Sequence, residues 1–253
     1  MLKLITPIIH TFDEADNIER TLAGVSWADQ VLVIDSYSTD NTLAICARFH
    51  NVKVIQNAYN GPTAQSNFGL AQDIKTDWVL SMDADYVVTP ALKQELSTMQ
   101  PAADVKGFNI SFEYLINGTP LKGSLYPPRT ALYRRADTHY ERDGHTQRAV
   151  VDGLVSDLKQ KIQHDDRKPY SRWLASQKRY ATQEAHKLSN AEWQDLSWPD
   201  RMRFLGVAPL LVIPYTLIFK GLIYSGKSGL IYTWQRIVAE VYLQVARLKL
   251  ATK

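Results

Sequence analysis

The sequence predicts an α/β fold: a mostly parallel sheet flanked by helices, followed by a helical C-terminal region. Within residues 1–100, strand-like and helix-like patterns alternate along the chain, and consecutive βα units form parallel sheets with right-handed crossovers. Residues 201–250 are instead helical and apolar. With 253 residues, 45% hydrophobic and 22% charged, the chain is long enough for one α/β domain plus an appendage.

The first hundred residues contain four apolar runs of strand type. They lie at residues 4–9, 30–34, 52–56 and 77–82, and helical spacing follows the first three at 18–25, 42–49 and 63–74. Each strand ends in an acidic or capping residue. Because parallel strands end at the same edge of a sheet, the polar loops at 11–14, 35–40 and 83–85 are expected to lie near each other.

The fourth strand ends in two aspartates separated by one small residue, Asp83-Ala84-Asp85. Carboxylates this close repel each other unless a cation lies between them or one is protonated. Hard divalent cations such as Mg²⁺ and Mn²⁺ take oxygen ligands of this kind. The motif therefore predicts a metal–phosphate site, and the alternative is a solvated turn.

Residues 101–165 change character and are expected to extend the sheet and to form the second wall of a cleft. Residues 107–116 alternate as a strand, Asn117-Gly118 is a hairpin turn signal, and 121–125 is the expected return strand. Two further strand-like runs lie at 130–133 and 149–151.

The C-terminal region, residues 166–253, is expected to be helical, with one amphipathic helix at 169–190 and another at 230–250. Residues 204–219 carry no charge, but a single membrane span needs about 20 apolar residues. We expect residues 201–250 to lie on or dip into a membrane surface. The alternative is a helical appendage packed on the catalytic domain or across a dimer.

Charge and composition limit the partners. Residues 200–253 carry eight Lys and Arg against two acids, a balance of +6, so the total of +3 leaves −3 for the remainder. A basic, apolar C-terminal piece favours anionic lipid over nucleic acid. The single cysteine, Cys46, fits a reducing compartment. The N-terminal stretch lacks a signal-peptide pattern, so a cytosolic catalytic body is expected.

Five stretches together resemble a known enzyme family. They are residues 6–18 with their strand, turn and acid, the Asp-x-x-Ser-x-Asp loop within 27–42, the Asn-containing helix start at 64–69, the acidic strand end at 78–85, and 126–135 with the loop around His145. In this order they resemble the family 2 glycosyltransferases, most closely the bacterial branch that includes lipopolysaccharide core β-glucosyltransferases.

The resemblance implies a GT-A catalytic domain over residues 1–165. Residues 1–100 would bind a nucleotide-sugar donor, with a UDP-sugar favoured, and 101–165 would bind the acceptor. It implies a metal-dependent inverting glycosyltransferase that uses Mg²⁺ or Mn²⁺. The acceptor would be a lipid-linked or cell-envelope glycan at the cytoplasmic face of the inner membrane.

The resemblance also implies roles for individual residues. Asp83 and Asp85 would bind the metal. Residues that would contact the donor are Thr11, Glu14, Asp35, Ser38, Asp40, Gln65, Asn67, Asp83, Arg129 and Arg134. Asp35 would accept a hydrogen bond from the uracil N–H, and Arg129, Arg134 or Arg135 would contact phosphate oxygens. The alternatives are that Asp35 only caps the next turn and that the arginines are surface charges.

Two departures from the family pattern concern the first turn and the acceptor loop. The usual Asn-Glu of the first turn is Asp13-Glu14 here. The acceptor loop has no Glu-Asp pair, and the related branch's His-Glu is replaced by His145-Thr146. An inverting transfer needs a general base, for which Asp143 and His145 are the candidates. His145 could instead contact the metal or phosphate, or have a structural role.

Two other functions remain open from the sequence. A sugar nucleotidyltransferase would also use a carboxylate-bound metal, but the chain lacks the glycine-rich phosphate loops that nucleotide-binding enzymes commonly carry. A non-catalytic, membrane-associated protein that retains the fold would account for the incomplete acceptor-loop motif.

Overall fold

In the computed structural model, residues 1–143 and 146–251 are described. The chain divides into two compact units. The sheet unit comprises residues 1–113 and 126–167, and the helical unit comprises 114–125 and 168–253. The sequence predicts residues 114–125 in the domain expected to end at residue 165, whereas the structure places them in the helical unit. That segment belongs there because Ile116 and Leu121 are buried against Leu222 and Tyr232.

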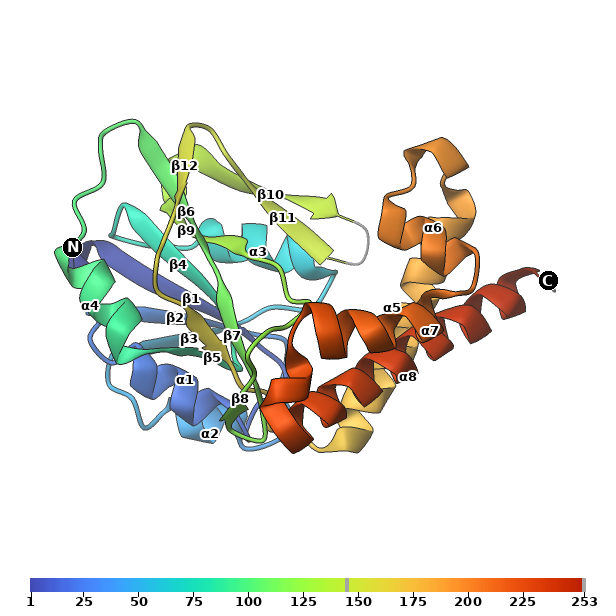
Figure 1. The fold of residues 1–253 in the computed structure, drawn as a ribbon. Coiled ribbons are helices and arrows are strands. Elements are labelled where there is room, and N and C mark those ends of the chain that lie inside the picture. Colours follow the sequence, from blue (N-terminus) through green and yellow to red (C-terminus); the bar gives the residue numbers. More distant parts are fainter. Residues whose placement is uncertain (144–145, 252–253) are drawn as a thin grey trace. The chain divides into compact units, whose positions relative to one another are not determined.

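A seven-stranded sheet forms the centre of the sheet unit, in the order β12-β6-β9-β4-β1-β2-β3 (Figure 1). Its strands are β1 (Ile5–Thr11), β2 (Val31–Asp35), β3 (Val52–Gln56), β4 (Trp78–Asp83), β6 (Val105–Ile110), β9 (Arg129–Arg134) and β12 (Leu154–Asp157). The four N-terminal strands β1, β2, β3 and β4 pair in parallel with one another, which confirms the expected parallel half. β9 is antiparallel to both β4 and β6, so the direction reverses there.

Both faces of this sheet are covered. On one face, Ile5, Ile9 and Leu80 pack in a core cluster with side chains of α1 (Ile18–Gly24), α2 (Thr42–Cys46) and α4 (Pro90–Thr98). On the other face, Ile8 and Val79 share a cluster with side chains at the end of α3 (Pro62–Leu70) and on β10 (Thr138–Asp143). Strands buried on both faces read as continuous apolar runs, which is why the sequence pattern identified them.

Shorter elements complete the sheet unit. β10 pairs with β11 (Thr146–Val151), and β5 (Tyr86–Val88) pairs with β13 (Ile162–His164). Two 3₁₀ turns are η1 (Leu2–Leu4) and η2 (Arg135–Asp137).

The hairpin expected after residue 107 differs from the prediction in its return strand. The run splits into β6 and β7 (Phe112–Ile116), and the return strand is β8 (Thr119–Pro120), not residues 121–125. The turn itself is as expected, since Asn117 and Gly118 both have positive φ angles of 51° and 76°.

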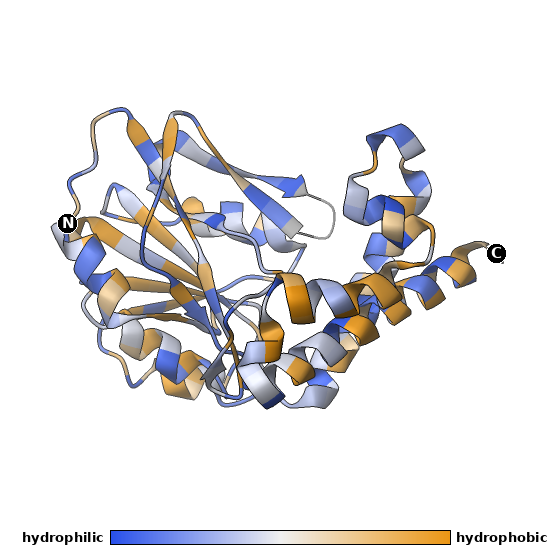
Figure 2. Cartoon of the chain, in the orientation of Figure 1, coloured by the Kyte–Doolittle hydropathy of each residue, from blue (hydrophilic) through white to orange (hydrophobic). Residues whose placement is uncertain are grey.

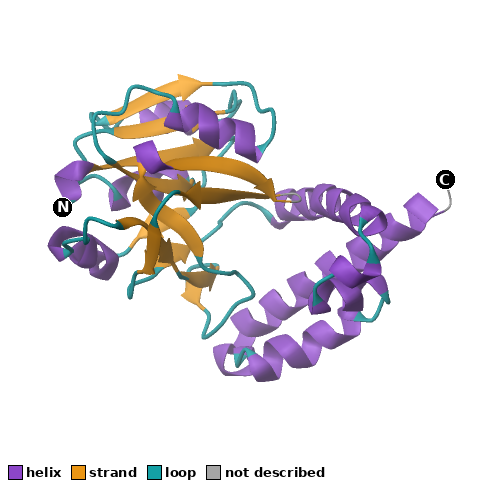
Figure 3. Cartoon of the chain, turned by 90° about the horizontal axis from the view of Figure 1, so that it is seen from above, coloured by secondary structure: helices purple, strands orange, loops and turns teal. Residues whose placement is uncertain are grey.

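The helical unit is built mainly on two long helices, α5 (Tyr170–Asn190) and α8 (Gly226–Ala251), which lie alongside each other (Figure 3). The shorter elements are η3 (Trp193–Asp195), α6 (Trp198–Phe204), α7 (Ala208–Pro214), a π-helical turn η4 (Tyr215–Phe219) and η5 (Leu222–Ser225). Ala185 and Leu188 of α5 pack with Leu243 of α8. The uncharged run at 204–219 is therefore broken into short pieces.

No single helix among the described residues has the length and hydropathy needed to cross a membrane. The segments Ala208–Phe219 and Leu222–Ala251 meet the criterion only together, with a bend of 73° between them.

Candidate active site

The acidic turn at the end of β4 lies where the sequence predicted it. Asp83 is the last residue of β4, and Asp85 directly precedes β5. The Ala84 carbonyl accepts a hydrogen bond from the buried Thr21 hydroxyl at 2.6 Å, which fixes the turn against α1. The Asp83 side chain is 47% exposed and that of Asp85 is 13% exposed. The two carboxylates therefore differ in their access to solvent.

His164, which was not among the predicted site residues, lies beside Asp85. Its Nε2 is 3.1 Å from the Asp85 carboxylate, because β13 pairs with β5 and places His164 opposite Tyr86. Burial disfavours the charged imidazole, but the carboxylates of Asp85 and Asp83 outweigh it and raise the pKa of His164 above its ordinary value. The available sequence signal was a second strand end of the same kind, His164-Asp165-Asp166.

Arg129 lies at the other carboxylate. Its Nη1 is 3.5 Å from the Asp83 carboxylate, and it donates to the Tyr86 hydroxyl at 3.1 Å and to the Tyr126 hydroxyl at 3.4 Å. Burial lowers the pKa of Arg129, but the interactions with Tyr86, Asp83 and Tyr126 raise it by more, so the pKa is above its ordinary value. A permanently charged guanidinium therefore faces the acidic turn.

Aromatic rings surround this charged group. The ring centroid of Tyr126 is 4.8 Å from that of Phe112 and 4.8 Å from that of His164. The hydroxyls of Tyr126 and Tyr86 are 2.5 Å apart. Burial raises the pKa of Tyr126 to about 12, so both hydroxyls stay protonated at neutral pH and accept hydrogen bonds from Arg129.

Asp35 ends β2 and is fully buried. Its carboxylate accepts hydrogen bonds from the Ser38 hydroxyl, from the Ser38 N–H at 3.0 Å and from the Gln56 amide at 3.0 Å. These contacts organise the loop at 35–40, as the capping alternative expected. A direct contact between Asp35 and a nucleotide base stays a prediction.

The loop after β1 is joined to the loop after β2 by reciprocal hydrogen bonds. The Asp13 N–H donates to the Ser38 hydroxyl at 2.9 Å, and the Thr39 N–H donates to the Asp13 carboxylate at 2.6 Å. Asp13 and Tyr37 have φ angles of 52° and 62°, a strained region for residues other than glycine that is often found at functional sites. The two loops therefore form one preorganised edge.

Glu14, Asp40 and Thr11 belong to the same edge. The Glu14 N–H donates to the Thr42 hydroxyl at 2.7 Å, and the Asp40 carboxylate accepts from the Ala15 N–H at 3.1 Å. Thr11 is paired in register with Asp35. Its buried hydroxyl has no hydrogen-bond partner among the described residues.

A charged network connects this edge to the end of the sheet unit. The buried Asp165 carboxylate pairs with Arg20 at 2.5 Å and with Arg167 at 2.8 Å. The Asn17 amide donates to Glu14 at 2.9 Å and to Asp166 at 3.0 Å. The Glu14 carboxylate and the segment that carries His164 are thus held by one set of contacts, which sequence reasoning did not find because its partners are about 145 residues apart.

The two α3 residues predicted to bind the donor have different surroundings. Gln65 is buried and bridges the Asn57 amide and the Ser36 hydroxyl, at 2.8 Å and 3.0 Å. Gln65 therefore supports the loop after β2. Asn67 donates to the Tyr140 carbonyl at 3.0 Å and accepts from the Tyr140 N–H at 2.9 Å. The amide of Asn67 therefore pairs with the backbone of β10, and a contact between Asn67 and the donor stays a prediction.

The position of Arg134 contradicts its predicted contact with the donor. Arg134 pairs in register with Trp78 at the start of β4, whereas Asp83 is at the end of that strand. Because β9 is antiparallel to β4, Arg129 lies near the acidic edge and Arg134 lies at the opposite edge. There Arg134 stacks over Trp78 at 5.2 Å and is 3.8 Å from Asp77. Arg135 is at that edge too, within hydrogen-bond distance of the Leu70 and Gln72 carbonyls.

The two candidates for the general base are Asp143 and His145. The backbone of Asp143 ends β10, and His145 lies outside the described residues. Their roles stay predictions.

A metal ion fits the donor chemistry of the acidic turn. No group of three or more His, Cys, Asp or Glu side chains among the described residues forms a ready-made metal shell. Two carboxylates are nevertheless what Mg²⁺ sites commonly use, because substrate phosphates and water supply the other ligands. Asp83 and Asp85, with His164 next to Asp85, are the residues that would hold such an ion.

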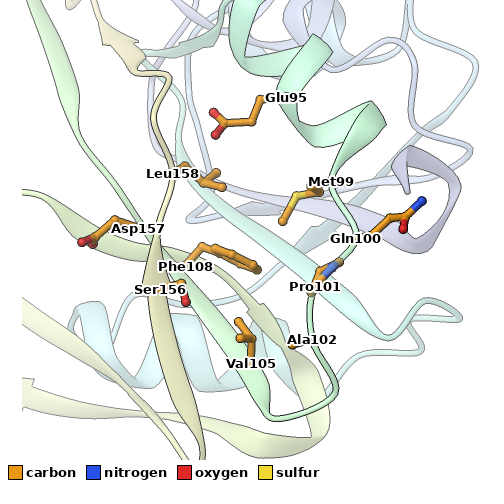
Figure 4. Close-up of a pocket in the computed structure, with 10 residues that line it drawn as sticks. All are labelled: Glu95, Met99, Gln100, Pro101, Ala102, Val105, Phe108, Ser156, Asp157 and Leu158. Atoms are coloured by element: carbon orange, nitrogen blue, oxygen red, sulfur yellow. The ribbon is translucent and has the colours of Figure 1, made fainter.

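A cavity of about 270 Å³ lies elsewhere in the sheet unit, between the end of α4 and strands β6 and β12 (Figure 4). It is lined by Glu95, Met99, Gln100, Pro101, Ala102, Val105, Phe108, Ser156, Asp157 and Leu158. None of these is a candidate site residue, so the cavity is separate from the acidic edge.

A comparison with family profiles identifies the chain. The profile described as Glycosyl transferase family 2 matches residues 6–142, which is more than half of the sequence. The chain therefore belongs to glycosyl transferase family 2, as the resemblance indicated.

Curated relatives include uncharacterised glycosyltransferases of Rickettsia bellii (strain RML369-C) and Rickettsia felis (strain ATCC VR-1525 / URRWXCal2). They are 39% identical over 98 residues and 34% identical over 96 residues. Each match covers 38% of this chain, and 32% and 33% of the relatives. The matched stretch thus spans about a third of the length of these relatives.

Two solved structures share the fold over 98% of this chain. The mannosyltransferase PcManGT from Pyrobaculum calidifontis, in complex with GDP-Man and Mn²⁺, is 15% identical, has a TM-score of 0.56 and is covered over 88% of its chain. S. aureus TarS 1–349, in complex with UDP-GlcNAc, is 16% identical, has a TM-score of 0.51 and is covered over 91%. These likenesses confirm the expected GT-A fold.

The backbone contacts of Asn67 predict that its replacement affects stability more than nucleotide binding. Replacing Asn67 with Ala removes two hydrogen bonds to β10, so the free energy of unfolding should fall by about 1–2 kcal/mol. The affinity for UDP should stay within about twofold of the wild type, since a change of that size is well under 1 kcal/mol. Urea unfolding and calorimetric titration measure the two quantities.

The exposed neighbour Asn60, replaced with Ala, is the matched control and should change neither quantity. A large loss of UDP affinity in Asn67→Ala with unchanged stability would instead support a direct contact between Asn67 and the donor.

Proposed function

We propose that the chain transfers a sugar from a nucleotide-diphosphate sugar, with a UDP-sugar favoured, to a lipid-linked or cell-envelope glycan. The observation that carries the proposal is the acidic turn with its facing guanidinium. Asp83 ends a buried strand, Asp85 lies in the turn that follows, and Arg129 lies 3.5 Å from Asp83. Ligands of open α/β sheets bind at such strand ends.

The chemistry of this site suits cleavage of a sugar–diphosphate bond. Breaking that bond leaves negative charge on the departing diphosphate, and a bound divalent cation would stabilise this charge as a Lewis acid. Asp83 and Asp85 would hold the cation, as the two carboxylates of one rigid turn. The Arg129 guanidinium supplies a second positive charge with fork geometry for phosphate oxygens. P. calidifontis PcManGT, which shares the fold, was solved with GDP-Man and Mn²⁺.

The joined loops after β1 and β2 are the proposed nucleotide site. Glu14, Ser38 and Asp40 lie on these loops, and their mutual hydrogen bonds hold the backbone in place before a ligand arrives. A preorganised site loses less conformational entropy on binding. The buried, unpartnered Thr11 hydroxyl at the same edge is a further polar group suited to a ligand contact.

Inversion by single displacement requires a base that takes the proton of the acceptor hydroxyl. Asp143 at the end of β10 and His145 in the following loop are the proposed candidates, as the sequence indicated. A sugar nucleotidyltransferase has no observation in its favour, and membership of glycosyl transferase family 2 supports the transferase.

The helical unit supplies the proposed membrane attachment at the cytoplasmic face of the inner membrane. Large apolar side chains are strongly exposed on α7, η4, η5 and α8. Figure 2 shows many hydrophobic residues along the C-terminal helices. They include Leu210, Ile218, Phe219, Ile223, Tyr224, Leu230 and Trp234, between 57% and 81% exposed. Lys220, Lys227 and Arg236 lie in the same segments. Exposed apolar side chains with interspersed basic residues are the pattern of a segment lying on an anionic lipid surface.

Replacing Asp85 with Asn should abolish sugar transfer and metal-dependent donor hydrolysis, because the neutral amide no longer holds the cation. We expect a loss of at least about a hundredfold in kcat/KM, as when an electrostatic partner of the leaving group is removed. The measurement is nucleoside diphosphate release from a panel of UDP-, GDP- and dTDP-sugars with Mn²⁺ or Mg²⁺.

Arg134→Gln, at the opposite edge of the sheet, is the matched control and should retain activity. Full turnover in excess EDTA would exclude the metal mechanism. If no sugar donor is turned over or bound, the chain is a non-catalytic member of the family.

The membrane proposal predicts that Ile218→Ser with Phe219→Ser weakens binding to vesicles of phosphatidylethanolamine and phosphatidylglycerol. Burial of one such side chain contributes about 1.5–3 kcal/mol, so partitioning should fall by at least about tenfold. Flotation or sedimentation with the vesicles measures it. Leu4→Ser with Leu154→Ser is the control, since both are 53% exposed in the sheet unit. Equal loss in both double variants would contradict a specific attachment surface.

A further inference from the structure

We propose that Arg129 is the resident counter-cation of Asp83 and couples metal binding to diphosphate binding. A divalent cation that binds Asp83 displaces the guanidinium, which then pairs with the diphosphate. This inference rests on the proposed function, because it assumes that the acidic turn is the metal site. The metal and the diphosphate are thereby coupled, and each makes the other bind more tightly.

The first argument is the position of the guanidinium. The Arg129 side chain is 32% exposed, and its contacts to Asp83, Tyr86 and Tyr126 all come from Nη1. A guanidinium stays protonated in proteins. The positive charge therefore cannot leave by deprotonation and must stay near the carboxylate or find another anion.

The second argument is the strength of the ion pair. The distance of 3.5 Å from Nη1 to the Asp83 carboxylate exceeds an ordinary charge-assisted hydrogen bond, and Asp83 is 47% exposed. Such a partly solvated pair is weak, so a divalent cation can replace it. The other carboxylate has its own partner, since Asp85 lies 3.1 Å from His164.

The third argument is the anchoring of Arg129 by the two tyrosine hydroxyls. The Tyr86 ring is buried and the Tyr126 ring is partly buried, and their hydroxyls are 2.5 Å apart. They hold Nη1 from the side, so loss of the Asp83 partner leaves the guanidinium at the site. The fork has further N–H donors, which suit the oxygens of a diphosphate that arrives with the metal.

Charge balance then gives the sign of the coupling. Without ligands, one guanidinium compensates part of the charge of two carboxylates. A divalent cation alone must compete with that guanidinium and leaves it without an anion, so the metal alone binds less tightly than it would without Arg129. A diphosphate supplies the missing anion, so each ligand raises the affinity for the other by the same factor.

The test is calorimetric titration of the full chain with Mn²⁺ alone, UDP alone and Mn²⁺ in the presence of UDP. In the wild type, UDP should raise the Mn²⁺ affinity by about tenfold or more, within the usual range of site–site coupling. In Arg129→Gln, Mn²⁺ alone should bind more tightly than in the wild type, because its competitor is gone, and the coupling factor should fall several-fold.

Arg129→Lys provides a second variant, since it keeps the charge but not the fork. Mn²⁺ alone should bind it as weakly as the wild type, which a merely structural role of Arg129 would not produce. Arg134→Gln, at the other edge of the sheet, should leave both affinities unchanged. Circular dichroism of each variant verifies folding before titration.

Two failures are distinguishable. If Arg129→Gln binds Mn²⁺ no more tightly than the wild type and keeps the full coupling to UDP, the inference is overturned while the metal–diphosphate site stands. If the wild type binds neither Mn²⁺ nor UDP, the proposed function itself fails.

Discussion

Two carboxylates confined to one turn at the end of a buried strand are the constraint on which the site depends. β4 is buried on both faces, so the backbone of Asp83 and Asp85 cannot relax apart to reduce their repulsion. The surrounding sequence places the Arg129 guanidinium beside Asp83 and the His164 imidazole beside Asp85. Arg129 is on β9 and His164 is on β13, so residues from the second half of the sheet unit complete the site whose carboxylates lie in the first half.

The same edge is rigid where it would meet a nucleotide. Asp13 and Ser38 tie the loops after β1 and β2 together, and Asn17 ties Glu14 to the segment that follows His164. Several predicted donor residues therefore hold one another in the ligand-free protein. Their carboxylates and hydroxyls shape the backbone, and contacts to the ligand are added to an edge that is already formed. The helical unit has a separate character, with long helices and exposed apolar side chains.

The sequence predicted local features well and non-local pairings poorly. The parallel strands and the acidic turn followed from apolar runs and strand ends, and Arg129 from its place in the resemblance. Arg134 was misassigned because only the antiparallel direction of β9 shows that it lies at the other edge. The contact of Asn67 with Tyr140 was missed because Tyr140 is on a strand 73 residues away. His164 was missed for the same reason, since its approach to Asp85 depends on the pairing of β5 with β13.

The most direct test of this account is the location of a bound metal. Crystals grown with Mn²⁺ and UDP, measured at the manganese absorption edge, would show the ion as an anomalous difference peak. The account predicts one strong peak within coordination distance of the Asp85 carboxylate, about 2.0–2.6 Å for a hard divalent ion. A diphosphate bound away from the ends of β1, β2 and β4, or a metal peak remote from Asp83 and Asp85, would contradict it.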